Sequence, residues 1–157
     1  MENWDKEITE FLILAAKHQV RMLMVGGGAV NFHGYQRHSA DVDFWIETTN
    51  ENFQNLIHVF KEMGYDIEDF PLEVKNQMQN ISLKFSPQSL NIELITFFSI
   101  NKTFEEAFLE SELVEIKEIE FLKWRVLSLE DLITSKIKAG RPKDLLDVQQ
   151  LREINKL

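Results

Sequence analysis

Apolar residues recur along this chain with two different periods, and these periods separate helical from extended segments. Between residues 3 and 17 they follow the i, i+3, i+4, i+7 spacing of an amphipathic helix, at Ile8, Phe11, Leu12 and Ala15. The uninterrupted apolar run at residues 22–25 predicts a short strand buried on both faces. A helix therefore leads into a central strand.

The next apolar segment, residues 41–46, alternates between polar and apolar positions. Side chains of a strand point to opposite faces in turn, so Asp41 and Asp43 share one face and Val42, Phe44 and Ile46 share the other. Two carboxylates held so close together disfavour double ionisation unless a cation lies between them. A divalent metal ion is the usual solution.

The middle of the chain predicts a helix and then a hairpin. Thr48-x-x-Glu51 is a capping-box pattern that should begin a helix, and a short strand is expected near residues 65–67. Alternating residues at 81–85 and 90–94, separated by turn residues at 86–89, predict two paired strands. On the second of them Glu93 faces away from its apolar neighbours.

The last third of the chain predicts a mixture of elements. Thr103-x-x-Glu106 begins a short helix, and residues 113–116 and 120–126 are two strands of an edge hairpin. A helix begins at Ser128, and Pro142 occupies the first turn of another. We expect one α/β domain over residues 1–157, a mixed β-sheet with packed helices, with its core at 20–97 and a C-terminal helical pair at 128–157.

Composition narrows the class of protein. The chain is 44% hydrophobic and 27% charged, as in a folded globular domain, and it has no cysteine. Its net charge of −9 argues against an extended nucleic-acid surface but not against a nucleotide, whose few phosphates can be neutralised locally. An acidic N-terminus and the absence of a long apolar run argue against a signal peptide and a membrane span, so we expect a cytoplasmic protein.

A triple glycine, Gly26-Gly27-Gly28, stands between the first strand and a brief helical piece. Gly-Gly, thirteen residues, then Asp-x-Asp between apolar neighbours resembles the signature of the DNA polymerase β-like nucleotidyltransferase superfamily. The segment GGGAVNFHGYQRHSADVDFWI is most similar to small bacterial nucleotidyltransferase-like proteins around the AbiEii family. These families also place a third carboxylate on a later strand, and Ile92-Glu93-Leu94 fits that pattern.

The resemblance implies a reaction and a set of roles. A nucleoside monophosphate would pass from a nucleoside triphosphate, ATP or another, to an acceptor, with release of pyrophosphate. Asp41, Asp43 and Glu93 would be catalytic and would hold one or two Mg²⁺ ions. The backbone at Gly26, Gly27 and Gly28 would bind the phosphates, because glycine turns let N–H groups approach an anion closely.

Basic residues in two places are further candidates for nucleotide binding. Arg37 and Ser39 occupy positions where related families often have Arg and Ser or Thr; for Arg37 a structural salt bridge is the equal alternative. The segment 136–144 resembles a Lys-rich helix junction near the end of many AbiEii-like proteins, and its candidates for the triphosphate or the acceptor are Lys136, Arg141 and Lys143. The alternative there is an exposed junction in which Lys143 pairs with Asp147 at i, i+4.

Other functions remain open on this sequence. The chain could be the nucleotidyltransferase-like component of a toxin–antitoxin pair that acts through a cognate protein partner. It could instead modify a lincosamide or aminoglycoside antibiotic, or be a binding domain that kept only the fold. The acceptor, whether a small molecule, a protein or an RNA end, is not identified by any motif.

Overall fold

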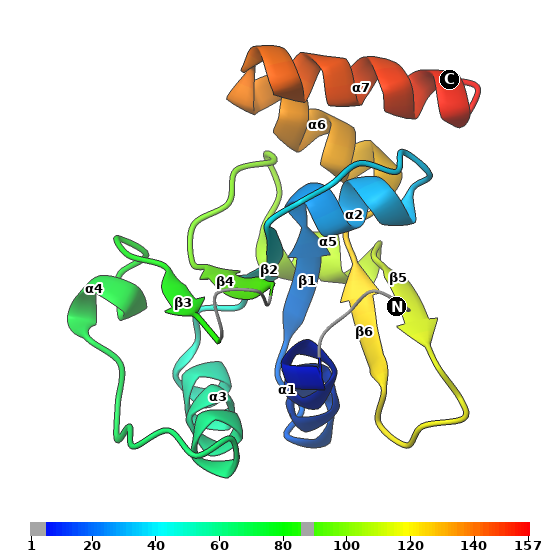
Figure 1. Cartoon of the computed structure of the whole chain (residues 1–157). Helices are drawn as coiled ribbons and strands as arrows, with labels where there is room; N and C mark the ends of the chain where they lie inside the picture. The colour runs from blue at the N-terminus through cyan, green and yellow to red at the C-terminus, as the bar shows by residue number, and fades with distance from the viewer. Residues whose placement is uncertain (1–5, 86–89) are drawn as a thin grey trace.

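A six-stranded mixed sheet organises the protein, whose computed structural model describes residues 6–85 and 90–157 (Figure 1). The strand order is β3-β4-β2-β1-β6-β5. β1 is antiparallel to β2, while the pairs β2–β4 and β1–β6 are parallel. The strands are β1 (Met22–Val25), β2 (Asp41–Ile46), β3 (Ile81–Leu83), β4 (Asn91–Ile95), β5 (Glu112–Glu115) and β6 (Lys123–Val126).

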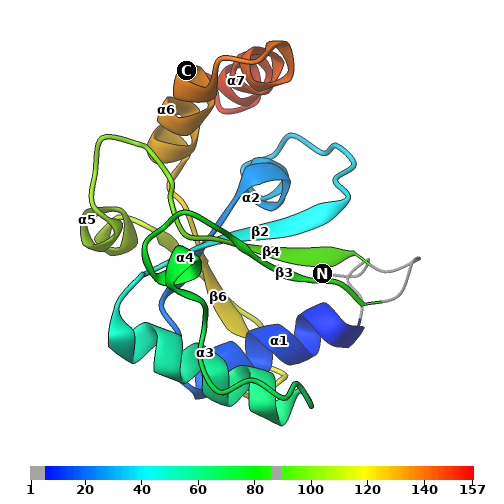
Figure 2. The ribbon, with the colours of Figure 1, turned by 90° about the vertical axis from the view of Figure 1, so that its left-hand side faces the viewer.

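Helices lie on both sides of this sheet (Figure 2). α1 (Lys6–Lys17) and α3 (Asn50–Glu62) cover one face. On the other side lie α2 (Gly26–Phe32) and the C-terminal pair α6 (Leu129–Ala139) and α7 (Pro142–Ile154). The two shortest helices are α4 (Leu72–Lys75) and α5 (Phe104–Leu109).

The main hydrophobic core fills the space between the sheet and the α1/α3 layer. Its largest fully buried side chains include Phe11 of α1, Phe44 of β2 and Phe53 of α3. The rings of Phe11 and Phe44 lie 6.2 Å apart between centroids. The apolar alternation of β2 therefore faces this core, and its carboxylates are left on the other side of the sheet.

The structure confirms the mixed α/β fold, the two hairpins and the C-terminal helical pair. β3 pairs with β4 and β5 with β6, both antiparallel. Gly140 ends α6 with a φ of +65°, and Pro142 is the first residue of α7. The predicted turn at 86–89 and the first residues of the N-terminal helix lie outside the described residues.

Two local predictions were wrong. α3 is capped by Thr49, whose side chain accepts a hydrogen bond from the backbone N–H of Asn52, and not by Thr48. The segment 65–67 is not a strand: it lies in the loop between α3 and α4, where Tyr65 and Asp66 are exposed. In the described parts of the chain no helix has the length and apolar character needed to cross a bilayer.

Candidate active site

The glycine turn and the aspartate strand meet because β1 and β2 are antiparallel neighbours. Val25, the last residue of β1, is the register partner of Asp43 on β2. Gly26, which follows it, has a φ of +60°, and a Cβ there would lie 2.5 Å from Oδ2 of Asp43. Glycine is therefore required at position 26 for two reasons: the left-handed backbone conformation, and the lack of space for a side chain beside the Asp43 carboxylate.

The other two glycines have different steric reasons. A Cβ on Gly27 would lie 2.6 Å from Oγ of Ser39, whose hydroxyl donates a hydrogen bond of 2.9 Å to the backbone carbonyl of Asp41. A Cβ on Gly28 would lie 2.9 Å from Sδ of Met24 in the core. The first two glycines thus border the aspartates, whereas Gly28 packs against the core.

The third carboxylate lies on the strand that neighbours β2 on its other side. β4 runs parallel to β2, and Glu93 is the register partner of Asp43. Ile92 and Leu94 are fully buried, so Glu93 lies on the opposite face of the sheet, the face of Asp41 and Asp43. The sequence expectation that this strand would bring Glu93 to the aspartate face is confirmed.

Electrostatics single out Asp43 among these carboxylates. Its pKa is raised from 3.8 to about 6, chiefly because it is largely buried, and further by the charges of Asp41 and Glu93. The charges of Lys136 and Lys143 act in the opposite direction but do not cancel this. The face therefore carries an excess of negative charge around Asp43.

The carboxylates fit a divalent metal ion in kind and in electrostatics, but they are not gathered around one point. Oxygen ligands are those that Mg²⁺ prefers, and a cation would relieve the repulsion that raises the pKa of Asp43. Among residues 6–85 and 90–157, however, no three acidic or histidine side chains lie close enough together to hold one ion. Glu93 instead accepts a hydrogen bond from Oγ of Ser82, 2.5 Å from its Oε2.

Most of the basic candidates are held by two buried aspartates of α7. Arg37 forms a bidentate pair with Asp147, with Nε–Oδ1 at 2.9 Å and Nη2–Oδ2 at 3.0 Å. Nζ of the buried Lys136 lies 3.0 Å from Asp147 and 3.4 Å from Asp144. The salt-bridge interpretation of Arg37 is thus confirmed, and its contact with phosphate stays a prediction.

Of the remaining two basic candidates, one forms an ion pair and the other does not. Nε of Arg141 lies 2.6 Å from Asp144 at the start of α7. Lys143 is exposed and makes no ion pair with any described residue. The alternative interpretation, in which Lys143 pairs with Asp147, was wrong, because Asp147 is occupied by Arg37 and Lys136.

Sequence reasoning missed three polar residues around this site. Asp144 and Asp147 recur at i, i+3 within an otherwise apolar helix face, a signal that two buried acids were anchoring the basic residues nearby. Ser82 gave no signal of its own, because a polar residue on an alternating strand is ordinary. Its contact with Glu93 depends on strand register.

Comparison with known proteins identifies the family of the chain. A family model described as a nucleotidyltransferase of unknown function (DUF6036) matches residues 1–157, the whole length of the sequence. No curated protein matches the chain. The match covers the glycine turn, the aspartate strand, the Glu93 strand and the C-terminal helices together. The chain therefore belongs to this family of nucleotidyltransferases of unknown function.

Proposed function

We propose that this protein is a metal-dependent nucleotidyltransferase that transfers a nucleoside monophosphate from a nucleoside triphosphate to an acceptor. One observation carries the proposal: Asp41, Asp43 and Glu93 share a sheet face on adjacent strands, with Gly26 directly against Asp43. The raised pKa of Asp43 is a second argument, because it indicates that the positive charges nearby do not balance the carboxylates on this face. A divalent cation with a bound triphosphate would restore the balance.

The residues would act on the reaction as follows. Asp41 and Asp43 would hold Mg²⁺, joined by Glu93, and this ion supplies charge neutralisation and in-line alignment of the reacting oxygens. The acceptor oxygen forms a bond to the α-phosphorus while the bond from that phosphorus to the bridging oxygen breaks. The bridging oxygen leaves with pyrophosphate, and Glu93 favours loss of the acceptor's proton.

The first candidates for phosphate binding are groups that have no ionic partner in the described structure. The backbone at Gly26 and Gly27 borders the aspartates, so its N–H groups are candidate donors to the triphosphate. Lys143 is the basic candidate without an ion pair in the described structure, and its charge already acts on Asp43. The backbone N–H of Gly28, in the same turn, is a further candidate donor. Arg37, Ser39, Lys136 and Arg141 have partners within the protein, so their contacts with a nucleotide would require an exchange of partners.

A thermal-shift series tests the proposal directly. ATP, GTP, CTP and UTP are added with and without Mg²⁺ to the wild type and to Asp41→Ala/Asp43→Ala. A nucleotide at about a hundred times its dissociation constant adds roughly 2.7 kcal/mol, which for a domain of this size is a shift of roughly 5–10 °C. We expect a Mg²⁺-dependent shift that the double variant loses.

The matched control is Glu118→Ala/Glu120→Ala. It removes two carboxylates at the same spacing from exposed positions between β5 and β6. This variant should keep the full nucleotide shift. If the wild type shows no shift with any nucleotide, or if the aspartate variant keeps it, the proposed site is wrong.

A second function has one observation in its favour. The three carboxylates are not close enough together to hold one ion. Such an arrangement is compatible with a protein that has lost catalysis and acts through a partner. The resemblance to AbiEii-like proteins suggests that such a partner would be a cognate toxin or antitoxin protein. Absence of nucleotide binding, together with a stable complex with the product of a neighbouring gene, would favour this function. An antibiotic-modifying enzyme would differ from the first proposal only in its acceptor.

A further inference from the structure

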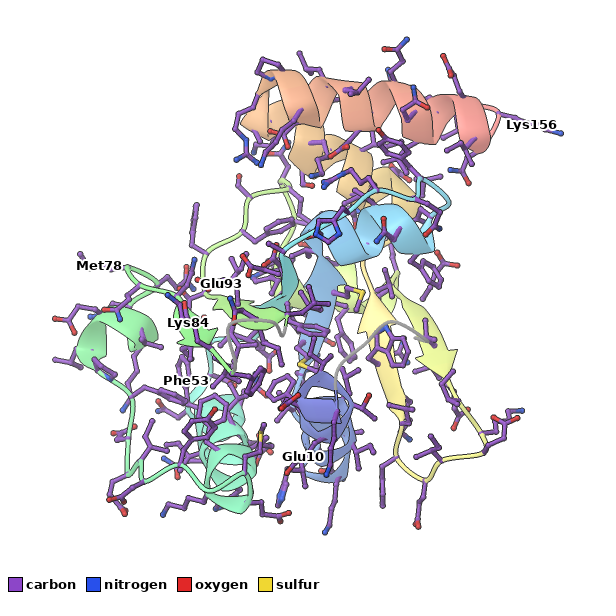
Figure 3. All side chains as sticks on the ribbon, in the orientation of Figure 1. Glu10, Phe53, Met78, Lys84, Glu93 and Lys156 are labelled. Carbon is purple, nitrogen blue, oxygen red and sulfur yellow. The ribbon has the colours of Figure 1, made fainter. Side chains whose placement is uncertain are left out.

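Glu93 has a neighbouring side chain on each of the two strands that flank β4. β4 lies between β2 and β3, and Glu93 is the register partner of Asp43 on one side and of Ser82 on the other. All three residues therefore point to the same face of the sheet. Figure 3 labels Glu93 on β4. Neighbouring strands lie about 4.8 Å apart, so a glutamate side chain can reach toward either one.

In this structure the carboxylate is turned toward Ser82. The serine hydroxyl donates to Oε2 of Glu93 at 2.5 Å, the short distance typical of a hydroxyl bound to a charged carboxylate. In that orientation Glu93 does not complete a group of three with Asp41 and Asp43. Strand register brings Glu93 beside Asp43, while its hydrogen bond directs the carboxylate to Ser82.

We propose that Ser82 is a positioning residue that holds Glu93 in a resting orientation, from which Glu93 must be released to join a cation bound by Asp41 and Asp43. This inference rests on the proposed function, because it assumes that the aspartates bind a divalent ion. The hydrogen bond to Ser82 then competes with ion binding. Part of the affinity for the ion is spent on breaking that bond.

The sign of the effect separates this role from a structural one. If Ser82 merely supported the site, removing its hydroxyl would weaken ion binding or leave it unchanged. If Ser82 instead holds Glu93 in its resting orientation, removing the hydroxyl frees the Glu93 carboxylate and tightens ion binding. The net contribution of an ordinary hydrogen bond at a solvent-exposed position corresponds to about a three- to tenfold change in affinity.

The experiment measures Mn²⁺ binding to the full chain, without nucleotide, from the electron paramagnetic resonance signal of free Mn²⁺. We expect Ser82→Ala to lower the dissociation constant about three- to tenfold, and Ser82→Thr, which keeps a hydroxyl, to behave like the wild type. Ser111→Ala is the matched control, since the Ser111 hydroxyl donates to the backbone carbonyl of Phe108. It should leave Mn²⁺ affinity unchanged.

A double variant shows whether the effect passes through Glu93. In a Glu93→Gln background, which lacks the carboxylate charge, Ser82→Ala should no longer tighten Mn²⁺ binding. Equal tightening with and without the Glu93 carboxylate would overturn the proposal, as would unchanged or weaker binding in Ser82→Ala alone. Failure of the wild type to bind Mn²⁺ at all would instead overturn the proposed function, and this inference with it.

Discussion

Two groups of charged residues lie on the same side of the sheet, and they are built in opposite ways. The carboxylate face has Asp41, Asp43 and Glu93 without an ion pair to any of them among the described contacts. The ionic network of α7 has Asp144 and Asp147 surrounded by Arg37, Lys136 and Arg141. The negative charges of the carboxylates are therefore neutralised by ion pairs in the ionic network of α7 but not on the carboxylate face.

The two groups differ accordingly in their pKa values. The pKa of Asp43 is raised to about 6 by burial and by its acidic neighbours. Burial also acts to raise the pKa of Asp144, but the hydrogen bond from Arg141 and the charges of Lys136 and Arg141 lower it overall. A buried acid that is fully paired serves the fold, whereas a half-buried acid without an ion pair is a candidate for ligand binding.

The largest expected effect comes from breaking the balanced group. Asp147→Ala removes the acid shared by Arg37 and Lys136. It leaves the half-buried Arg37 without an ion pair, and it leaves the buried Lys136 with only its longer contact to Asp144. We expect a loss of about 3–5 kcal/mol in the free energy of unfolding, measured by urea denaturation. Glu153→Ala, at an exposed position of the same helix, should change it by less than about 0.5 kcal/mol.

A smaller effect follows from placing a methyl group against the unbalanced face. Gly26→Ala combines a left-handed φ of +60° with a Cβ only 2.5 Å from the Asp43 carboxylate. Gly64→Ala has a φ of +95° with nothing within 4 Å. We expect a loss of about 1 kcal/mol for Gly64→Ala and about 2–3 kcal/mol for Gly26→Ala, measured by denaturation. Equal losses would show that the contact with Asp43 is unimportant.

Removing a charge from the unbalanced group should stabilise the protein. Asp43→Asn abolishes a carboxylate whose ionisation is disfavoured in the folded state, so in metal-free buffer at pH 8 we expect a gain of roughly 1–2 kcal/mol after allowance for solvent screening. A loss of stability in this variant would mean that Asp43 is already compensated.

The dependence of this gain on pH follows from the sign of the pKa shift. Because the folded pKa of about 6 lies above the unfolded value of 3.8, ionised Asp43 costs stability above pH 6, and this cost fades as the pH falls toward 4. The stability difference between Asp43→Asn and the wild type should therefore shrink from pH 7 to pH 4. The lowered pKa of Asp144 works in the opposite sense, since its contribution is lost at acid pH, as pH falls through its lowered folded pKa.

The smallest effect on stability is expected for Lys143→Ala. Lys143 is exposed and has no ion pair in the described structure, so unfolding should change by less than about 0.5 kcal/mol. Nucleotide affinity should nevertheless fall, and more so at low salt, because the lost interaction is between an exposed charge and phosphate. Nucleotide titrations at two salt concentrations, with Lys138→Ala as the control, measure this.

The parts of the site that sequence could predict are those built from residues close together in the chain. The alternation in β2 placed Asp41 and Asp43 on one face, and the glycine turn before it marked a close approach of the backbone. The position of Glu93 required an additional assumption, that β4 pairs with β2, which the structure confirms. Local periodicity fixes the face of a strand but not the identity of its neighbours.

The parts that sequence could not predict depend on contacts between distant residues. Arg37 and Asp147 are separated by 110 positions, and nothing near either residue identifies the other. For the same reason the alternative for Lys143, a pair with Asp147 on the same helix, was wrong, because Asp147 contacts Arg37 and Lys136. The i, i+4 rule describes an isolated helix surface, and here a buried partner from another segment replaces it.

The attachment of α7 to the segment before β2 has a consequence for how the protein is made. Arg37 is held by Asp147, a methyl group on Gly34 would collide with Ile154, and the side chain of Asn155 donates to the backbone carbonyl of His33. During synthesis the sheet strands emerge from the ribosome before α7, so the loop that leads into the aspartates lacks these three contacts until α7 docks. We expect the nascent chain to complete this loop only after α7 has been synthesised and has docked.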